Sequence, residues 1–147
     1  MATIHPVPAE WAARAYVDAG AYADKYRRAL EAPEAFWREE SARLDWMKPW
    51  TRLNRCSFDE VDFGIEWFAD GTLNVSANCL DRHLADHGED IAIIWEGDDP
   101  AQQRQLTYRA LHEDVCRMAN ALKSLGARRG DRVTIYMPMI PEAAMAM

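Results

Sequence analysis

The chain has 147 residues, of which 49% are hydrophobic and 28% charged, a length and composition that suit a globular domain with a sizeable core. Lys and Arg number 17 against 24 Asp and Glu, and the formal net charge of -7 argues against the broad basic surface that nucleic acid requires. No run approaches the roughly 20 apolar residues of a membrane span, and the opening residues MATIHPVPAEW lack a signal-peptide pattern, so we expect a cytoplasmic protein without nucleic-acid or membrane partners.

The cysteines indicate neither a disulfide framework nor a zinc site. Cys56, Cys79 and Cys116 are far apart in the sequence, odd in number, and form no CxxC pair. We therefore expect three reduced, partly buried thiols.

Two short amphipathic helices are predicted in residues 22–46. Apolar Tyr26 and Leu30 share one helical face with Tyr22, and Pro33 is placed to begin the second helix. The segment WMKPW, residues 46–50, has the composition of an aromatic ligand platform, but a proline between two indoles is more typical of a packed helix exit.

The next stretch combines an irregular segment with a strand and a turn. Residues 51–63 are polar and without periodicity, whereas IEWF at residues 65–68 predicts a strand. Asp70-Gly71 then predicts a tight turn with positive φ. Asn74 or Ser76 is expected to cap a helix that continues to Gly88.

The remaining residues favour strand, helix, strand and helix in that order. IAIIWEG, residues 91–97, predicts a strand buried on both faces, and Thr107 and Gly126 bracket a long helix. The apolar positions of that helix step by 4, 3, 4 and 3 through Leu111, Val115, Met118, Leu122 and Leu125. RVTIYMP, residues 132–138, predicts a second strand, and Pro141 begins a helix. We therefore predict an α/β fold with the beginning of a parallel sheet.

Glycine placement argues against a phosphate-binding loop. The seven glycines form neither GxGxxG nor GxxxxGK, and GARRG at residues 126–130 is interpreted as a helix end followed by a solvated turn.

Two groups of side chains have the residue types of a metal or acid-base site. Cys79, His83 and His87 are spaced by four and could ligate a metal, but the outer two lie about 12 Å apart along a helix, which favours a polar edge. Glu96, Asp98 and Asp99 could hold Mg²⁺ or act as acid-base carboxylates, but their position before Pro100 favours a solvated loop. There is no GxSxG motif, and we identify no Cys/His spacing that supports a nucleophile.

Several long segments resemble the start of the acetyl-CoA synthetase family, in order and at the family's spacing. They are FWREESARLDWMKPW (36–50), IEWFADGTLNVSANCLDRHL (65–84), IAIIWEGDD (91–99), LTYRALHEDVCRMANALKSLG (106–126) and GDRVTIYMPMIPEA (130–143). The last segment alone is shared with propionyl-CoA synthetases, whereas NCLDRHL followed by IIWEGDD is more similar to the acetate enzymes.

The resemblance implies an AMP-forming acetate–CoA ligase that uses ATP, Mg²⁺ and CoA and passes through acetyl-AMP. The family places its phosphate loop and lysine, its ribose-binding aspartate, its CoA-binding arginines and its C-terminal lysine in motifs that do not occur in these 147 residues. The resemblance therefore assigns no catalytic, cofactor-binding or metal-binding residue here, and we expect this part alone to be inactive and to bind none of the cofactors.

The resemblance also implies two regions. Residues 1–84 correspond to the family's N-terminal extension, and residues 85–147 to the incomplete start of the AMP-binding large domain. Phe36, Trp37 and Trp67, with Trp46, would then lie against the body of the enzyme, and the partner of the chain would be the remainder of that large domain.

Two alternatives remain open from the sequence. One is a fragment of a propionyl-CoA synthetase, and the other is a free-standing module that binds a partner through its aromatic and sheet surfaces. A sharp, cooperative melt of the isolated chain favours the module, whereas two strands of a parallel sheet without neighbours predict poor independent stability.

Overall fold

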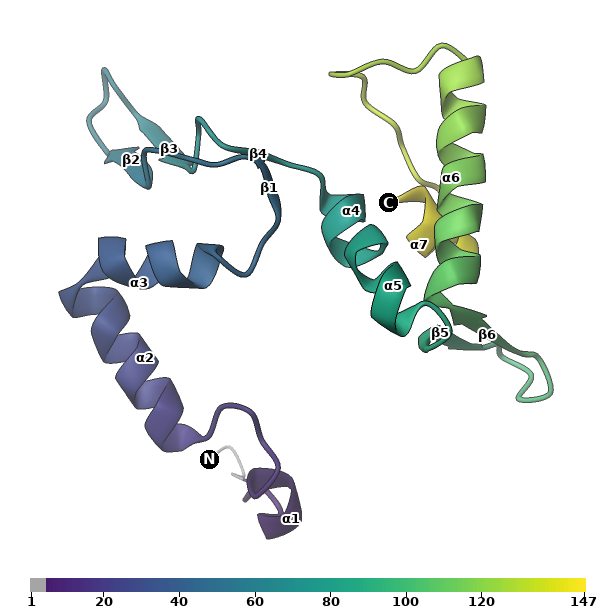
Figure 1. Ribbon diagram of the computed structural model, residues 1–147, viewed down its shortest axis with the longest axis horizontal. Helices are drawn as coiled ribbons and strands as arrows, with labels where there is room; N and C mark the ends of the chain where they lie inside the picture. The colour runs from purple at the N-terminus through teal and green to yellow at the C-terminus, as the bar shows by residue number, and fades with distance from the viewer. Residues whose placement is uncertain (1–4) are drawn as a thin grey trace. The chain divides into compact units, whose positions relative to one another are not determined.

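The computed structural model describes residues 5–147 and divides into two compact units, Met1–Leu73 and Asn74–Met147 (Figure 1). Each unit combines helices with small two-stranded antiparallel sheets, so the predicted mixture of helix and strand is confirmed. None of the helices within residues 5–147 is long and apolar enough to cross a membrane.

The first unit begins with three helices. They are α1 (Ala9–Ala12), α2 (Ala19–Glu31) and α3 (Pro33–Ser41). Asp18 caps α2 by accepting a 2.8 Å hydrogen bond from a backbone N–H of the first turn, and Pro33 occupies the first turn of α3, where its missing N–H costs nothing. The predicted helix pair is confirmed.

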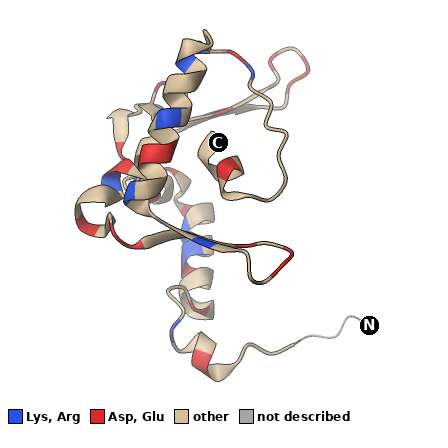
Figure 2. Cartoon of the chain, turned by 90° about the vertical axis from the view of Figure 1, so that its right-hand side faces the viewer, with Lys and Arg blue, Asp and Glu red and all other residues tan. Residues whose placement is uncertain are grey.

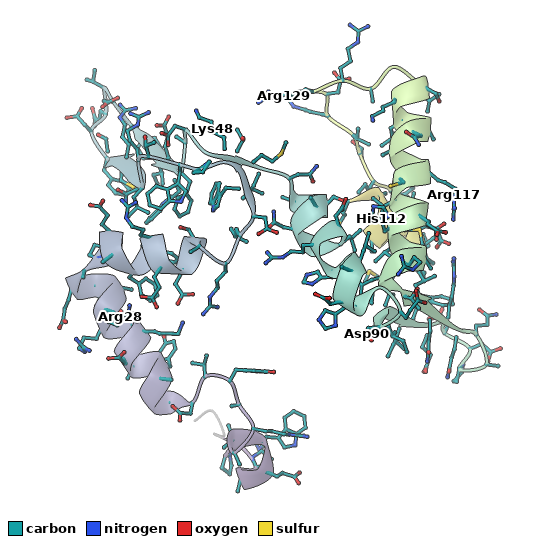
Figure 3. All side chains as sticks on the ribbon, viewed as in Figure 1. Arg28, Lys48, Asp90, His112, Arg117 and Arg129 are labelled. Atoms are coloured by element: carbon teal, nitrogen blue, oxygen red, sulfur yellow. The ribbon has the colours of Figure 1, made fainter. Side chains whose placement is uncertain are left out.

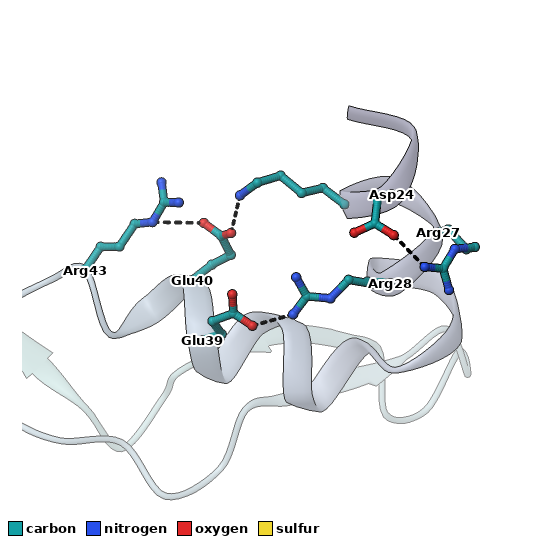
Figure 4. A network of polar contacts seen from close by, with 7 residues as sticks. Asp24, Arg27, Arg28, Glu39, Glu40 and Arg43 are labelled. Carbon is teal, nitrogen blue, oxygen red and sulfur yellow. Dashed lines mark hydrogen bonds and ion pairs between the residues drawn. The ribbon is translucent and has the colours of Figure 1, made fainter. Parts of the chain in front are cut away.

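Charged side chains join α2 to α3 (Figure 4). Lys25 Nζ lies 2.5 Å from Glu40 Oε1, Arg43 Nε lies 3.2 Å from Glu40 Oε2, and Arg28 pairs with Glu39. The hydrogen bond from Lys25 is the main reason that the pKa of Glu40 is lowered. Because Glu40 is shared by two cations, it is the centre of this helix–helix contact.

Four short strands complete the first unit: β1 (Trp46–Lys48), β2 (Asn54–Ser57), β3 (Gly64–Trp67) and β4 (Thr72–Leu73). β1 pairs with β4, and β2 pairs with β3, both antiparallel. The strand predicted near residues 65–68 is confirmed. The expectation that residues 51–63 are irregular is wrong over β2, where pairing with β3 orders a polar segment that has no apolar alternation of its own.

The turn after β3 differs from its prediction. Its positive φ, 52°, belongs to Phe68 and not to Asp70 or Gly71. Gly71 is needed for a different reason, because an added Cβ would lie 2.8 Å from Cζ3 of Trp46. The dipeptide is therefore constrained by close packing against an indole ring.

The helix predicted to run to Gly88 is broken into three pieces. They are α4 (Val75–Cys79), the 3-10 turn η1 (Asp81–His83) and α5 (Leu84–His87). Asn74 caps α4 as expected, by accepting a 3.1 Å hydrogen bond from a backbone N–H. Leu80 departs from helical geometry, with φ -124°, and its side chain is buried in the core. The prediction of one continuous helix is wrong because burial of Leu80 takes precedence over helical continuity.

The second unit then forms a hairpin and two helices: β5 (Ile91–Glu96), β6 (Gln103–Thr107), α6 (Tyr108–Ser124) and α7 (Pro141–Ala146). The β5 strand and both helices are confirmed, and Thr107 caps α6. β6, which pairs antiparallel with β5, was missed because it is polar. Gly126 takes φ +90° directly after the helix.

Two strand predictions in this unit are wrong. β5 is not buried on both faces, since Ile94 is 73% exposed. Residues 132–138 form no strand, although they have the apolar composition of one. An extended segment becomes a strand only through hydrogen bonds to a neighbour, and the described residues supply no neighbouring strand for it.

The core of the second unit is small. It consists of Leu80, Leu106, Leu111 and Met145, with partly buried Ala92, Ile93, Tyr108, Ala110 and Val115 packed against it. The core thus joins the broken helix, the hairpin and the two helices α6 and α7. No described side chain of large volume is completely buried.

Candidate functional site

Aromatic rings gather around Phe68 in the first unit. Its ring centroid lies 5.2 Å from that of Trp50, 5.5 Å from that of Trp46 and 6.0 Å from that of Trp67. Trp67 in turn meets Trp37 of α3 edge to face at 5.6 Å. These distances and tilts are those of favourable aromatic pairs.

The polar edges of two of these indoles are satisfied within the unit. Trp46 Nε1 donates to the backbone oxygen of Ser41 at 2.9 Å, and Trp50 Nε1 donates to Ser41 Oγ at 3.1 Å. The Arg38 guanidinium lies 4.7 Å from the centroid of Trp50. WMKPW is not the helix exit that the sequence favoured, because Trp46–Lys48 form β1 beyond the end of α3 at Ser41, but its two indole N–H groups are engaged within the protein.

Asp70 closes the loop beside this cluster. Its carboxylate accepts hydrogen bonds from the backbone N–H of Thr51 at 3.1 Å, from the Thr51 hydroxyl, and from the backbone N–H of Arg52 at 3.2 Å. The Thr51 hydroxyl is the largest cause that holds the pKa of Asp70 well below its usual range. All these partners are structural, and none leaves the carboxylate free for chemistry.

The three residues weighed as a metal site are separated by the helix break. Cys79 ends α4, whereas the rings of His83 and His87 are 6.3 Å apart beyond Leu80. The ring of His83 lies 5.4 Å from that of Tyr108 in a tilted contact, and His87 Nδ1 lies 2.8 Å from Asp90 Oδ2. Within residues 5–147 no three His, Cys, Asp or Glu side chains come together in a way that could hold an ion.

The acidic turn at residues 96–99 and the loop at residues 126–130 both form hydrogen bonds that stabilise local structure. Asp99 accepts from the backbone N–H of Ala101 at 2.9 Å, and Gln103 Nε2 donates to Glu96 at 3.2 Å, so both carboxylates brace the β5–β6 hairpin. Figure 2 shows this acidic loop projecting from the paired strands. In the segment 126–130, Asp131 accepts a 2.7 Å hydrogen bond from the N–H of Arg128, which makes the solvated turn that we expected.

A cleft lies within the second unit, between α4, α6 and α7. Its volume is about 700 Å³, within the range of small-molecule pockets. Apolar side chains form most of its wall, including Leu111, Val115, Met118, Leu122 and Met145. Its polar residues include Cys79, Asp81, His112 and Cys116.

Three of those polar side chains contact one another. Cys116 Sγ lies 3.6 Å from His112 Nε2, and the same nitrogen lies 3.5 Å from Asp81 Oδ1. Figure 3 shows His112 on the side of α6 toward α4 and α5, whereas Arg117 points away. Cys116, His112 and Asp81 therefore form a small polar contact at the edge of this otherwise apolar cleft.

That no Cys/His spacing here supports a nucleophile stays a prediction, although His112 and Cys116 are in contact. His112 and Cys116 are separated by four residues in the helix that the sequence predicted most clearly, and this spacing places them on one face. The contribution of Asp81 depends on the packing of η1 against α6, which no local pattern encodes. All three cysteines are free and exposed, which corrects the expectation of partly buried thiols.

Two family models match the chain in succession. The model described as "Acetyl-coenzyme A synthetase N-terminus" matches residues 22–79, and the model described as "AMP-binding enzyme" matches residues 80–147. Together they cover the chain from Tyr22, within α2, to its last residue.

Curated relatives are similar over nearly the whole chain. The acetyl-coenzyme A synthetase of Novosphingobium aromaticivorans is 58% identical over 98% of the chain, and that of Parvibaculum lavamentivorans is 59% identical over 98%. The chain spans only 22% of the length of each of these relatives. Among solved structures, the acetoacetyl-CoA synthetase from Streptomyces lividans matches 92% of the chain and 21% of its own, with a TM-score of 0.74 and 28% identity.

Proposed function

Since the chain belongs to the acetyl-coenzyme A synthetase family, we propose that it is the N-terminal part of an acetate–CoA ligase. The complete enzyme would make acetyl-CoA from acetate, ATP and CoA through acetyl-AMP. The observation that carries this proposal is the 58% identity to a curated acetyl-coenzyme A synthetase over 98% of the chain. The 28% identity to the acetoacetyl-CoA synthetase favours acetate over the larger acid.

Residues 1–84 would be the N-terminal extension of this enzyme, and residues 85–147 the beginning of its AMP-binding large domain. The succession of the two family models, which meet between residues 79 and 80, supports such a division. The two compact units, which meet after Leu73, support a boundary in the same part of the chain. The broken helix from Val75 to His87 would then connect the two regions.

The remainder of the large domain would be the partner of this chain. Each unit exposes apolar side chains that a completed domain would cover. Trp67 is 42% exposed in the first unit, and Ile94 and Tyr136 are 73% and 100% exposed in the second. Residues 132–138 likewise have the composition of a strand without a hydrogen-bonded neighbour. These open surfaces support a role in building and positioning the large domain.

ATP, Mg²⁺ and CoA would bind outside these residues. ATP needs backbone amides and a cation at its phosphates, and the glycines at 126 and 130 instead frame a turn that is closed by Asp131. This turn therefore does not fit the phosphates of a nucleotide. Three free thiols, none of them paired, favour a reducing compartment, which supports a cytoplasmic enzyme.

A chimera tests the proposal. The segment of the N. aromaticivorans synthetase that matches this chain is replaced by the chain itself, and acetate-dependent formation of AMP and acetyl-CoA is measured. We expect activity within about threefold of the parent, because 58% identity conserves most packing contacts.

The matched control replaces the same segment with the corresponding part of the S. lividans acetoacetyl-CoA synthetase. At 28% identity its packing surface differs more, and we expect a folded yield and activity well below those of the first chimera. A first chimera that is soluble and folded but has no acetate-dependent activity would overturn the proposal.

A further inference from the structure

Asp70 is the only aspartate or asparagine in the chain that is followed by glycine. In such a pair the backbone nitrogen of the glycine can attack the carboxyl carbon of the preceding side chain, and glycine has no Cβ to hinder the five-membered ring that closes. Asp59 and Asp62, in the same part of the chain, each precede a residue whose side chain does hinder it. Ring closure is therefore least hindered between Asp70 and Gly71.

The fold engages both oxygens of the Asp70 carboxylate. Oδ1 accepts from the backbone N–H groups of Thr51 and Arg52 at 3.1 and 3.2 Å, whereas Oδ2 accepts from the same Thr51 N–H at 3.1 Å and from the Thr51 hydroxyl. These donors stabilise the ionised carboxylate, and the hydroxyl is the largest cause that lowers the pKa of Asp70. An ionised carboxylate is a poor electrophile, because its oxygen leaves the carbon readily only as water.

The attacking nitrogen is also engaged. The N–H of Gly71 donates to the backbone oxygen of Phe68 at 2.9 Å, so its proton is held within the turn. A Cβ added to Gly71 would lie 2.8 Å from the ring of Trp46 and 3.0 Å from Cβ of Trp50, so this backbone is closely packed. Ring closure joins the Asp70 carboxyl to the Gly71 nitrogen, and it therefore requires the hydrogen bonds of both groups to break.

From these contacts we infer that Asp70–Gly71 is the site in this chain where a succinimide and then an isoaspartate form, and that the loop at residues 51–52 suppresses this modification in the folded protein. The inference is independent of the ligase reaction. It assigns the loop a protective role, because the fold keeps both reacting groups of the dipeptide hydrogen-bonded to other residues.

The modification needs no reagent other than water. The Gly71 nitrogen bonds to the carboxyl carbon of protonated Asp70, and one carboxyl oxygen leaves as water with its own proton and that of the amide. Water then adds to one of the two ring carbonyls and breaks the bond from that carbon to nitrogen. Cleavage at the side-chain carbonyl restores aspartate, whereas cleavage at the main-chain carbonyl gives isoaspartate of the same mass.

An isoaspartate at residue 70 adds one carbon to the backbone and leaves the carboxylate on the former main-chain carbon. Gly71 then shifts relative to Trp46, against which it is packed, and the carboxylate no longer matches the N–H groups of Thr51 and Arg52. We therefore expect the modified first unit to refold poorly, so that opening of this loop leads to a lasting loss of folded protein.

The experiment follows isoaspartate at residue 70 in the purified 147-residue chain, at mildly acidic pH in native buffer and in concentrated urea. The tryptic peptide of residues 56–82 is separated from its isoaspartyl isomer by chromatography and assigned by electron-transfer fragmentation. We expect the rate in urea to exceed the native rate at least about twentyfold, because several hydrogen bonds to a charged group must break before the ring closes. Asp59 and Asp62 lie in the same peptide and should form far less isoaspartate in both solvents.

Variants test the role of the Thr51 hydroxyl. Thr51→Val removes the hydroxyl and keeps the shape of the side chain, and in a chain that is still folded by circular dichroism it should raise the native rate about fivefold. Thr134→Val makes the same replacement in the second unit and should leave the rate unchanged. In urea all three proteins should react at the same rate, because the contacts of the folded loop are then absent.

The chimera provides a second measurement of the same loop in a complete enzyme. We expect the same suppression there, and the peptide readout does not depend on whether the chimera activates acetate. Equal rates in native buffer and in urea, in either protein with a native circular dichroism spectrum, would overturn the inference. A folded Thr51→Val variant that reacts at the wild-type rate would also overturn the protective role of the loop.

Discussion

Phe68 combines an unfavourable backbone conformation with favourable packing of its side chain. Its φ of 52° is unfavourable for a residue with a Cβ, yet its ring contacts Trp46, Trp50 and Trp67. The aromatic contacts therefore offset a backbone cost of about 1 kcal/mol.

Substitutions at Phe68 can separate these two contributions. Phe68→Ala and Phe68→Gly both remove the ring, but only glycine accepts positive φ without strain. We expect Phe68→Gly to be more stable than Phe68→Ala by about 1 kcal/mol, the reverse of the usual order. Urea unfolding followed by tryptophan fluorescence measures the difference, and an alanine variant more stable than the glycine variant would contradict it.

Asp70 predicts a pH dependence of stability. Its pKa is lowered in the folded chain, chiefly by the Thr51 hydroxyl, so the unfolded chain binds its proton more readily. The stabilisation is complete above the unfolded pKa of about 4 and is lost as the pH falls below it. We expect Asp70→Asn to be less stable than the wild type at pH 7, and the difference to shrink toward pH 3.

The control for this experiment is Asp59→Asn. Asp59 also accepts a backbone hydrogen bond, from the N–H of Val61 at 2.9 Å, but it has no side-chain donor such as the Thr51 hydroxyl. The comparison separates the loss of the Asp70 contacts from the loss of one carboxylate. A difference between Asp70→Asn and wild type that stays constant from pH 7 to pH 3 would exclude the linkage.

Among helices and strands, α6 depends on local signals that can be tested singly. Thr107 Oγ1 accepts a 3.2 Å hydrogen bond from the N–H of Ala110. Thr107→Ala should therefore cost about 1 kcal/mol of stability, whereas Thr107→Ser should cost only a few tenths. Chemical unfolding followed by circular dichroism at 222 nm distinguishes the two, and equal losses would show that the cap contributes nothing.

The helices α2, α3 and α6 could be predicted because their information is local. Pro33, Thr107 and Gly126 mark ends, and apolar residues repeat at helical spacing between them. β2 and β6 could not be predicted, because they are polar and become strands through partners outside their own sequence. The break at Leu80 likewise follows from burial in a core made by distant residues.

Only part of the contact between Cys116, His112 and Asp81 could be predicted from the sequence. His112 and Cys116 are four positions apart in α6, a helix with clear apolar periodicity, and this spacing is a local signal. Asp81 and the apolar wall from Met145 come from η1 and α7, and only the fold places them beside α6. Sites assembled from several elements therefore exceed what motif spacing can predict.

The chain exposes many large apolar side chains to solvent. Tyr136 is 100% exposed and Met139 is 91% exposed; Tyr136 lies within, and Met139 directly after, residues 132–138, which have strand composition without a strand partner. If the large domain supplies the neighbouring strand, the backbone amides of residues 132–138 should exchange slowly in the chimera and rapidly in the isolated chain. Hydrogen exchange read by mass spectrometry tests this, and equal exchange in both would contradict it.

We propose that these residues belong to an acetate–CoA ligase whose chemistry resides outside them. The most direct test is AMP formation from acetate, ATP, Mg²⁺ and CoA by the purified 147-residue chain, with the chimera assayed in parallel. We predict acetate-dependent AMP from the chimera and none above background from the chain. Acetate-dependent AMP formation by the chain alone would contradict the account.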